Sequence, residues 1–145
     1  MKLHPISCLG RALGVAAWTI ASATAQAHDL TVEVLGARSD KGSVAGALYG
    51  SEASWLKDAL QGERQAAADR TLLVYRNLQP GRYALSLFHD ENGNGRLDKK
   101  LLMPSEGYGF SRDAPVRFGP PRFAAAAFAV DGGEQRQTIR MRYMF

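Results

Sequence analysis

The sequence predicts an all-β protein, an antiparallel β-sandwich of about six or seven strands with one short helix. Several short runs alternate apolar and polar residues with a period of two, as in strands that bury one face. Turn-forming pairs such as Pro80-Gly81 separate these runs. One segment, residues 51–62, has the apolar spacing and the end residues of a helix.

The start of the chain predicts a cleavable signal peptide, residues 1–27, followed by a single domain, residues 28–145. A basic start precedes an apolar core at residues 12–21, and Ala25 and Ala27 form an A-x-A cleavage pattern. The apolar core is too short to span a bilayer comfortably. We therefore expect a periplasmic or secreted protein, cleaved after Ala27, with no membrane span once the signal is removed.

The mature chain that this cleavage would produce has no cysteine and a mild charge. Cys8 is the only cysteine and precedes the cleavage point, so we expect neither a disulfide nor thiol chemistry. Removing Lys2 and Arg11 from the 18 basic residues leaves 16 against 14 acidic residues, a net charge of +2. The bases are scattered rather than clustered with aromatic side chains, which argues against a nucleic-acid partner.

The first half of the mature chain is predicted to contain two strands and the helix. Residues 30–37 and 44–50 read as strands, and we expect them to pair as a hairpin. The helix over residues 51–62 has Ser51 as its cap and Gly62 as its stop.

Two further strands are predicted after a polar connector at residues 63–70. They cover residues 71–76 and 83–88 and flank the Pro-Gly turn. The pattern L-x-P-G-x-Y-x-L, from Leu78 to Leu85, resembles one seen in transthyretin-like and collagen-adhesin-type sandwich domains. There, leucine and tyrosine brace a corner between the two sheets, so the resemblance favours a transthyretin- or immunoglobulin-like sandwich.

The second half of the chain is less regular. Residues 104–121 are rich in glycine, proline and aromatics and are predicted to form a long ordered loop. Residues 122–130 carry alanines that favour a helix, but their Phe and Val ends favour the strand that we predict. Residues 136–145 read as a half-exposed final strand. Its terminal phenylalanine resembles the assembly signal of outer-membrane barrels, but a small barrel is the less favoured alternative because the strands are too few and too short.

The leading candidate site is the segment HDENGNGRLD, residues 89–98. Calcium takes six to eight oxygen ligands, and an EF-hand loop supplies them from alternate positions. Counted from the first aspartate, positions one, three, five, seven and nine are Asp90, Asn92, Asn94, the carbonyl of Arg96, and Asp98. The glycine at position six permits the sharp turn.

The last third of the EF-hand pattern is missing. Position twelve is Leu101 instead of a bidentate acid, and Glu106 or Glu91 is the acid that would complete the shell. Two formal charges, Asp90 and Asp98, predict an affinity near the millimolar class. The competing interpretation is that the two Asn-Gly pairs only form the turn, and the sequence leaves both open.

A hydrolase is a further, less favoured alternative. A Ser-His-Asp set would consist of His89, either Ser105 or Ser111, and either Asp90 or Asp113. No nucleophile-elbow pattern surrounds either serine. We therefore expect a protein that is not an enzyme.

The segment EGYGFS places Tyr108 and Phe110 between glycines. Exposed rings on a glycine-rich loop can stack on a sugar or a partner peptide. The alternative function is thus a carbohydrate- or protein-binding module of the cell envelope. The opposing interpretation is that the rings fold back onto the end of the sandwich.

Three motifs in order, NLQPGRYALSLFHDENGNGRLD, PSEGYGFS and FGPPRF, resemble one bacterial family of small exported proteins. The family is catalogued as domain of unknown function 2141. The resemblance spans about residues 30–143 and implies an exported, β-rich single domain, but no activity. The alanine run at residues 122–130 departs from the more polar segment expected there. We therefore predict an exported, non-catalytic β-sandwich of unknown role, whose partner would be an unidentified envelope ligand or protein.

Overall fold

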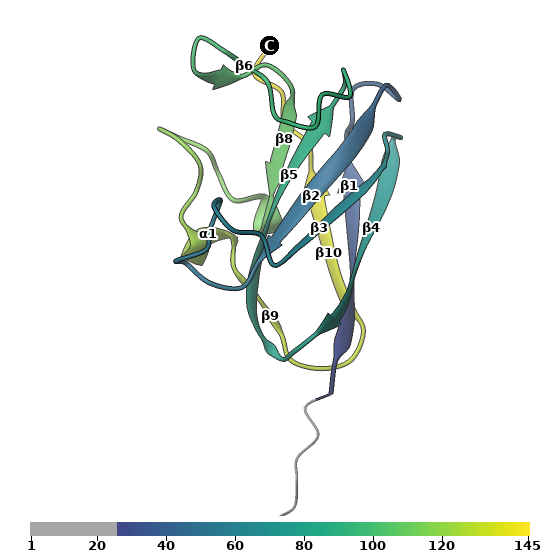
Figure 1. Cartoon of the computed structure of the whole chain (residues 1–145), viewed down its shortest axis with the longest axis vertical. Helices are drawn as coiled ribbons and strands as arrows, with labels where there is room; N and C mark the ends of the chain where they lie inside the picture. The colour runs from purple at the N-terminus through teal and green to yellow at the C-terminus, as the bar shows by residue number, and fades with distance from the viewer. Residues whose placement is uncertain (1–25) are drawn as a thin grey trace, which may run out of the picture.

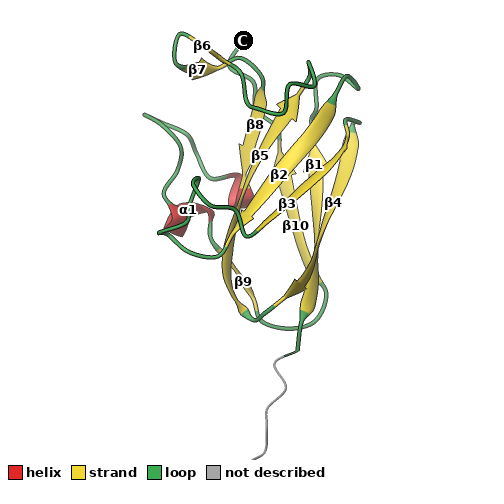
Figure 2. Cartoon of the chain, in the orientation of Figure 1, coloured by secondary structure: helices red, strands yellow, loops and turns green. Residues whose placement is uncertain are grey.

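Two β-sheets packed face to face form the body of the protein (Figures 1 and 2). The structure is a computed structural model, and it describes residues 26–145. Residues 1–25, with the apolar core of the predicted signal peptide, lie outside the described part. No helix within residues 26–145 is long and apolar enough to cross a bilayer. The predicted all-β class is confirmed, but the single short α-helix within residues 26–145 is Phe123–Ala126 and not the segment 51–62.

The first sheet has three strands in the order β10-β1-β4. Their bounds are His28–Leu35 for β1, Arg70–Leu78 for β4 and Gln135–Arg140 for β10. Strand β1 runs antiparallel to β4 and parallel to β10. A parallel pair requires a long crossover connection. Here the chain between β1 and β10 forms β4 and the whole second sheet, which is long enough for such a crossover. The β1–β10 pair is the one pair of the described strands that departs from the antiparallel arrangement.

The second sheet has the strand order β3-β2-β5-β8, and β9 also pairs with β5. Its strands are β2 (Ser43–Tyr49), β3 (Gln61–Ala66), β5 (Gly81–Asp90), β8 (Gly107–Phe110) and β9 (Phe128–Val130). The remaining elements are a small hairpin of β6 (Lys99–Lys100) and β7 (Met103–Pro104), a 3-10 turn at Ser111–Asp113, and helix α1 (Phe123–Ala126). The hairpin lies at the same end of the sandwich as the end of β5 (Figure 1).

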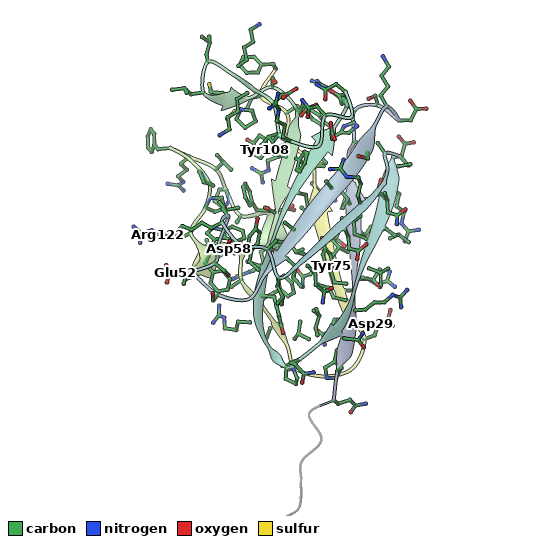
Figure 3. The ribbon with its side chains drawn as sticks, viewed as in Figure 1. Asp29, Glu52, Asp58, Tyr75, Tyr108 and Arg122 are labelled. Atoms are coloured by element: carbon green, nitrogen blue, oxygen red, sulfur yellow. The ribbon has the colours of Figure 1, made fainter. Side chains whose placement is uncertain are left out.

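The main core lies between the two sheets. Alternate residues of each strand point inward, because successive side chains of a strand face opposite sides. The fully buried side chains with the largest volumes include Leu30, Leu48, Leu73, Tyr75, Leu85 and Ile139. Tyr75 lies inside the sandwich (Figure 3). Its hydroxyl has no hydrogen-bond partner among the described residues, and burial raises its pKa.

Gly46 in β2 permits the close approach of the sheets at this point. A Cβ atom there would lie 2.6 Å from Cδ2 of Leu87 and 2.7 Å from Cδ1 of Leu73, and it would also collide with the hydroxyl of Tyr75. The position therefore accepts no side chain without movement of the core.

The L-x-P-G-x-Y-x-L motif braces the turn between β4 and β5. The hydroxyl of Tyr83 donates a hydrogen bond to the carbonyl of Gln79 at 2.7 Å. Leu78 and Leu85 are buried on either side of the turn. This matches the corner that the motif implies in sandwich domains.

The predicted helix over residues 51–62 is wrong. Residues 51–58 form turns, and the chain then extends as β3. Leu56 has a φ of 56°, which a right-handed helix excludes. The predicted polar connector at residues 63–70 is also wrong in part, since its first half belongs to β3.

Tertiary contacts of Trp55 explain this outcome. Its indole N–H donates to the carbonyl of Pro121 at 2.8 Å, and its ring lies 5.0 Å from that of Tyr49 in an edge-on arrangement. A helix of about twelve residues is marginal by itself in water. The buried aromatic cluster and the open edge of β2 therefore outweigh the helical pattern.

Three other expectations need correction. The strands near residues 30–37 and 44–50 do not pair as a hairpin, because β1 and β2 belong to different sheets. The alanine run at residues 122–130 is helix α1 followed by β9, not a single strand. The segment predicted as a long loop, residues 104–121, contains β8, which pairs with β5.

We predict that Gly46→Ala destabilises the fold by about 1–3 kcal/mol, because the new methyl group overpacks the core. Urea unfolding followed by circular dichroism measures the change. Gly62→Ala in the neighbouring strand β3 is the matched control, since a Cβ atom there meets only the carbonyl of Gly46, at 3.9 Å. Equal midpoints for the two variants would contradict the prediction.

Candidate functional site

The loop that follows β5 is organised around the carboxylate of Asp90. This last residue of β5 has no exposed area. Its Oδ1 accepts the N–H of Asn94 at 3.0 Å, and its Oδ2 accepts the N–H of Gly95 at 2.9 Å. Gly93 and Gly95 have φ values of +73° and +81°, which glycine adopts without strain. The loop therefore folds back onto the strand that precedes it.

Arg64 from β3 supplies the charge opposite Asp90. Its Nη1 lies 2.8 Å from Oδ2 of Asp90 and also donates to the hydroxyl of Ser43. Burial acts to raise the pKa of the Asp90 carboxyl, but hydrogen bonds from Arg64, Gly95 and Asn94 outweigh it and hold the pKa below its usual value. A buried carboxylate with these donors is ionised at neutral pH.

The outer part of the loop gathers two asparagines around Asp98. The amide of Asn92 donates to Oδ2 of Asp98 at 2.6 Å, and the amide of Asn94 donates to Oδ1 at 2.8 Å. The Oδ1 atoms of both asparagines accept backbone N–H groups two residues further on, from Asn94 and Arg96. These are Asx turns, in which a short polar side chain satisfies the turn backbone.

Glu106 closes the neck of the loop. Its Oε1 accepts the N–H of Glu91 and its Oε2 accepts the N–H of Asp98, both at 3.0 Å. The side chain is 5% exposed, so these bonds form with little competition from water. One buried carboxylate thus joins the two ends of the eight-residue loop.

The structure therefore brings together all the residues predicted for the calcium site, but in different roles. Asn92, Asn94 and Asp98 share one cluster, and Asp90 lies beneath it. Glu106 holds the backbone at the neck, and the guanidinium of Arg96 points toward Asp98 at 3.8 Å. Among residues 26–145, no group of three or more His, Cys, Asp or Glu side chains could hold a metal. Any cation at this loop would depend on amide and carbonyl oxygens in addition to the two aspartates.

Two arginines bind carboxylates of the loop region, and the sequence patterns do not predict either of these contacts. Arg64 pairs with Asp90, and Arg38 binds the carboxylate of Glu91 through Nε and Nη2 at 3.1 and 2.5 Å. Both come from segments distant in sequence, and a single arginine in a polar stretch carries no signal of its partner.

His89 is a buried structural residue at the end of the core. Its Nε2 is 2.7 Å from the carbonyl of Lys41, which requires an N–H there. Its Nδ1 therefore accepts the hydroxyl of Tyr143 at 2.8 Å. The hydroxyl of Ser111 is likewise used, since it accepts the N–H of Leu85 and donates to a backbone carbonyl. The contacts of the described residues thus contain no serine–histidine pair.

A groove of about 490 Å³ lies beside the loop, on the outer face of the second sheet. Phe88, Tyr108 and Phe110 form its floor. The β6–β7 hairpin forms one wall, and residues 116–120 form the other. Tyr108 is 7% exposed and Phe110 is half-buried against Trp55, so the two rings do not present an exposed stacking platform. Figure 3 shows Tyr108 below the hairpin end of the molecule.

The fold and loop define a class: a β-sandwich that carries an Asn/Gly loop sealed by buried carboxylates. The chain belongs to the family described as "Uncharacterized protein conserved in bacteria (DUF2141)", whose model matches residues 32–138. This match confirms the resemblance seen in the sequence motifs. No curated protein and no solved structure matches the chain.

We predict that Asp90→Asn lowers the free energy of unfolding by about 1–3 kcal/mol at pH 7, because Arg64 loses its charged partner. A carboxyl with a lowered folded-state pKa stabilises the fold above its unfolded pKa, and this contribution disappears as pH falls through the folded value. The gap between wild type and variant should therefore narrow as pH falls from about 4, the usual pKa of an aspartate, toward pH 2. Urea titrations over this range measure it.

The matched control is Asp131→Asn, which changes an exposed aspartate in the turn before β10. This variant should leave the free energy of unfolding unchanged at both pH 7 and pH 2. A wild-type advantage over Asp90→Asn that is equally large at pH 2 and pH 7 would contradict the assignment. The Glu91 pKa is also lowered, chiefly by Arg38, but it affects both proteins equally and cancels in the difference.

Proposed function

We propose that the protein is an exported, non-catalytic β-sandwich of the bacterial cell envelope whose loop at residues 90–98 binds Ca²⁺ weakly. The observation that carries the calcium proposal is the contact of Asn92, Asn94 and Asp98 in one cluster above Asp90. Carboxylate, amide and carbonyl oxygens are the ligands that Ca²⁺ prefers.

Calcium would take the place of the amide N–H groups as the partner of Asp98. The Oδ1 atoms of Asn92 and Asn94 each accept a single N–H group in the described contacts and keep a second lone pair. The carbonyl of Arg96 and a carboxylate oxygen of Asp90 lie in the same loop. Waters would fill the remaining positions of the shell, as in other calcium loops.

The charge of the loop supports a weak site. Only Asp90 and Asp98 contribute formal charge, and Arg64 already neutralises Asp90. Calcium affinity rises with the number of charged ligands, so a dissociation constant in the millimolar class follows. Such a site is useful outside the cytoplasm, where calcium is abundant.

Two observations support the rest of the proposal. The signal-peptide pattern of residues 1–27 and the lack of any cysteine after Cys8 support export of a domain stabilised by its core. The engagement of His89 and Ser111 in structural hydrogen bonds supports a non-catalytic role.

We expect 10 mM CaCl₂ to raise the melting temperature by roughly 5 °C if the dissociation constant is about 1 mM. The stabilisation corresponds to about 1.4 kcal/mol, because calcium binds only the folded loop. Thermal melts by circular dichroism measure the shift, and 10 mM MgCl₂ should produce a smaller one, since Mg²⁺ requires a tighter octahedral shell.

Asp98→Asn should abolish the calcium-dependent shift, while Asp131→Asn keeps it. A melting temperature that does not respond to calcium, or that responds equally in the Asp98→Asn variant, would overturn the calcium proposal. Export is tested separately, by the N-terminal sequence of the protein recovered from periplasm or medium, which should begin at His28.

A further inference from the structure

The β6–β7 hairpin carries an apolar tip that solvent surrounds. Leu101 and Leu102 connect the two strands and are 85% and 94% exposed. Met103 beside them is also exposed. Large apolar side chains at such exposure contribute nothing to the stability of the fold, since burial is what makes them stabilising.

The backbone at this tip is also unfavourable for its residues. Leu101 and Leu102 have φ values of 50° and 67°. A two-residue hairpin turn with positive φ at both central positions favours Asn-Gly, whereas leucine is strained there. The same chain uses Asn-Gly twice in the adjacent loop. Two leucines at this position therefore work against both solubility and turn geometry.

A second apolar tip lies across the groove. Residues 115–122 form a loop that contains Phe118, whose side chain is fully exposed. The hairpin and this loop line the two sides of the same groove, and both project from one side of the sandwich (Figures 1 and 2). We call the hairpin, residues 99–104, and the loop, residues 115–122, the two arms.

The arms are also the basic part of the molecule. They contain Lys99, Lys100, Arg117 and Arg122 and no acidic residue. Of the other 14 basic residues, Lys2 and Arg11 precede the described part, which leaves 12 against all 14 acidic residues. The arms thus carry a charge of +4 and the rest of residues 26–145 a charge of −2.

The acidic side chains nearest the arms do not remove this contrast. Asp98 precedes Lys99 and keeps its charge, because its donors Asn92 and Asn94 are neutral, so counting it with the arms lowers their charge only from +4 to +3. Asp113 accepts the N–H of Arg140. Glu52 and Asp58 appear on the same side of the molecule as Arg122 in Figure 3. Within two residues of the tips at Leu101–Leu102 and Phe118, the only charged residues are lysine and arginine.

We propose that the two arms dock the protein onto the surface of an anionic phospholipid bilayer. Leu101, Leu102 and Phe118 enter the boundary between headgroups and acyl chains, and the flanking bases contact the lipid phosphates. Apolar side chains next to lysine and arginine are the chemistry by which peripheral proteins hold a membrane surface. Docking of this kind needs no membrane-spanning segment.

The charge pattern favours a bilayer over the other occupants of an apolar groove. A second copy of this chain would bring the basic arms of one molecule against those of the other, which electrostatic repulsion opposes. A neutral sugar would give the four bases no charged partner, and of the aromatic rings on the groove floor and the arms only Phe118 is exposed, while Tyr108 is buried. A membrane with anionic lipids satisfies both the apolar tips and the bases at once.

Vesicle sedimentation of the protein in EDTA tests the proposal without any contribution from the calcium loop. We expect binding to vesicles of phosphatidylcholine and phosphatidylglycerol, and much weaker binding to phosphatidylcholine alone. Raising the salt concentration should weaken the binding, because exposed charges are screened. No binding to anionic vesicles at low salt would overturn the proposal, as would equal binding to both kinds of vesicle.

Charge variants locate the surface. Lys99→Gln with Lys100→Gln should reduce binding about 25-fold, at about a fivefold loss for each base near an anionic surface. The matched control is Lys41→Gln with Arg82→Gln, which removes two exposed bases outside the arms and should leave binding within about threefold, since screening limits distant charges. Equal losses in the two double variants would overturn the assignment to the arms.

Tip variants separate docking from folding. Leu101→Asn with Leu102→Gly supplies the residues that the turn prefers, so the melting temperature should not fall, while vesicle binding should drop at least about tenfold. Phe118→Ser should cause a similar drop, and Leu72→Ser, an exposed leucine of β4, should not. Retained binding in either arm variant, or an equal drop with Leu72→Ser, would overturn the proposal.

Analytical ultracentrifugation at the same protein concentration tests the remaining alternative, in which a second copy of this chain covers the arms. A monomer that binds vesicles supports membrane docking. A dimer that the Leu101→Asn, Leu102→Gly variant dissociates would overturn it in favour of a second copy.

Discussion

Strand β5 is the element on which the rest of the structure depends, because it forms hydrogen bonds along both edges. Strand β2 pairs with one edge, and β9 and β8 share the other. The inner face of β5 packs Leu85 and Leu87 into the core, and its outer face places Phe88 on the groove floor. Its last residue, Asp90, begins the loop. A register slip of one residue would exchange the two faces, so the pairing of this strand positions both the loop and the groove.

Two buried carboxylates, Asp90 and Glu106, shape the loop through hydrogen bonds to its backbone. Backbone N–H groups in a tight turn need acceptors when they are withdrawn from water, and these side chains provide them from opposite sides. The asparagines and Asp98 form a second, more exposed layer. A cation would compete with hydrogen bonds that already stabilise this layer. This competition is the physical reason why we expect the loop to bind a cation with low affinity.

The arms show a different balance from the loop. At the loop, residue types and backbone geometry agree, with glycine at each position of positive φ. At Leu101 and Leu102 they disagree, and the exposed area adds to the conflict. Natural sequences tolerate such local conflicts mainly where a surface serves an interaction. Both arms project from the rigid second sheet, a placement typical of binding segments carried by a stable scaffold.

The sequence by itself determined the elements whose signal is local. Alternation of side chains predicted the strands that became β1, β4, β5 and β10, the Pro-Gly pair predicted the turn before β5, and the Asn-Gly pairs predicted the loop. Only the tertiary structure decided which strands pair, that residues 51–62 form a turn and part of β3 rather than a helix, and that Arg64 and Glu106 close the loop around Asp90. The reason is physical. A periodic pattern reports how one segment meets a surface, whereas the identity of that surface depends on contacts among residues far apart in the chain, such as Trp55 with Pro121.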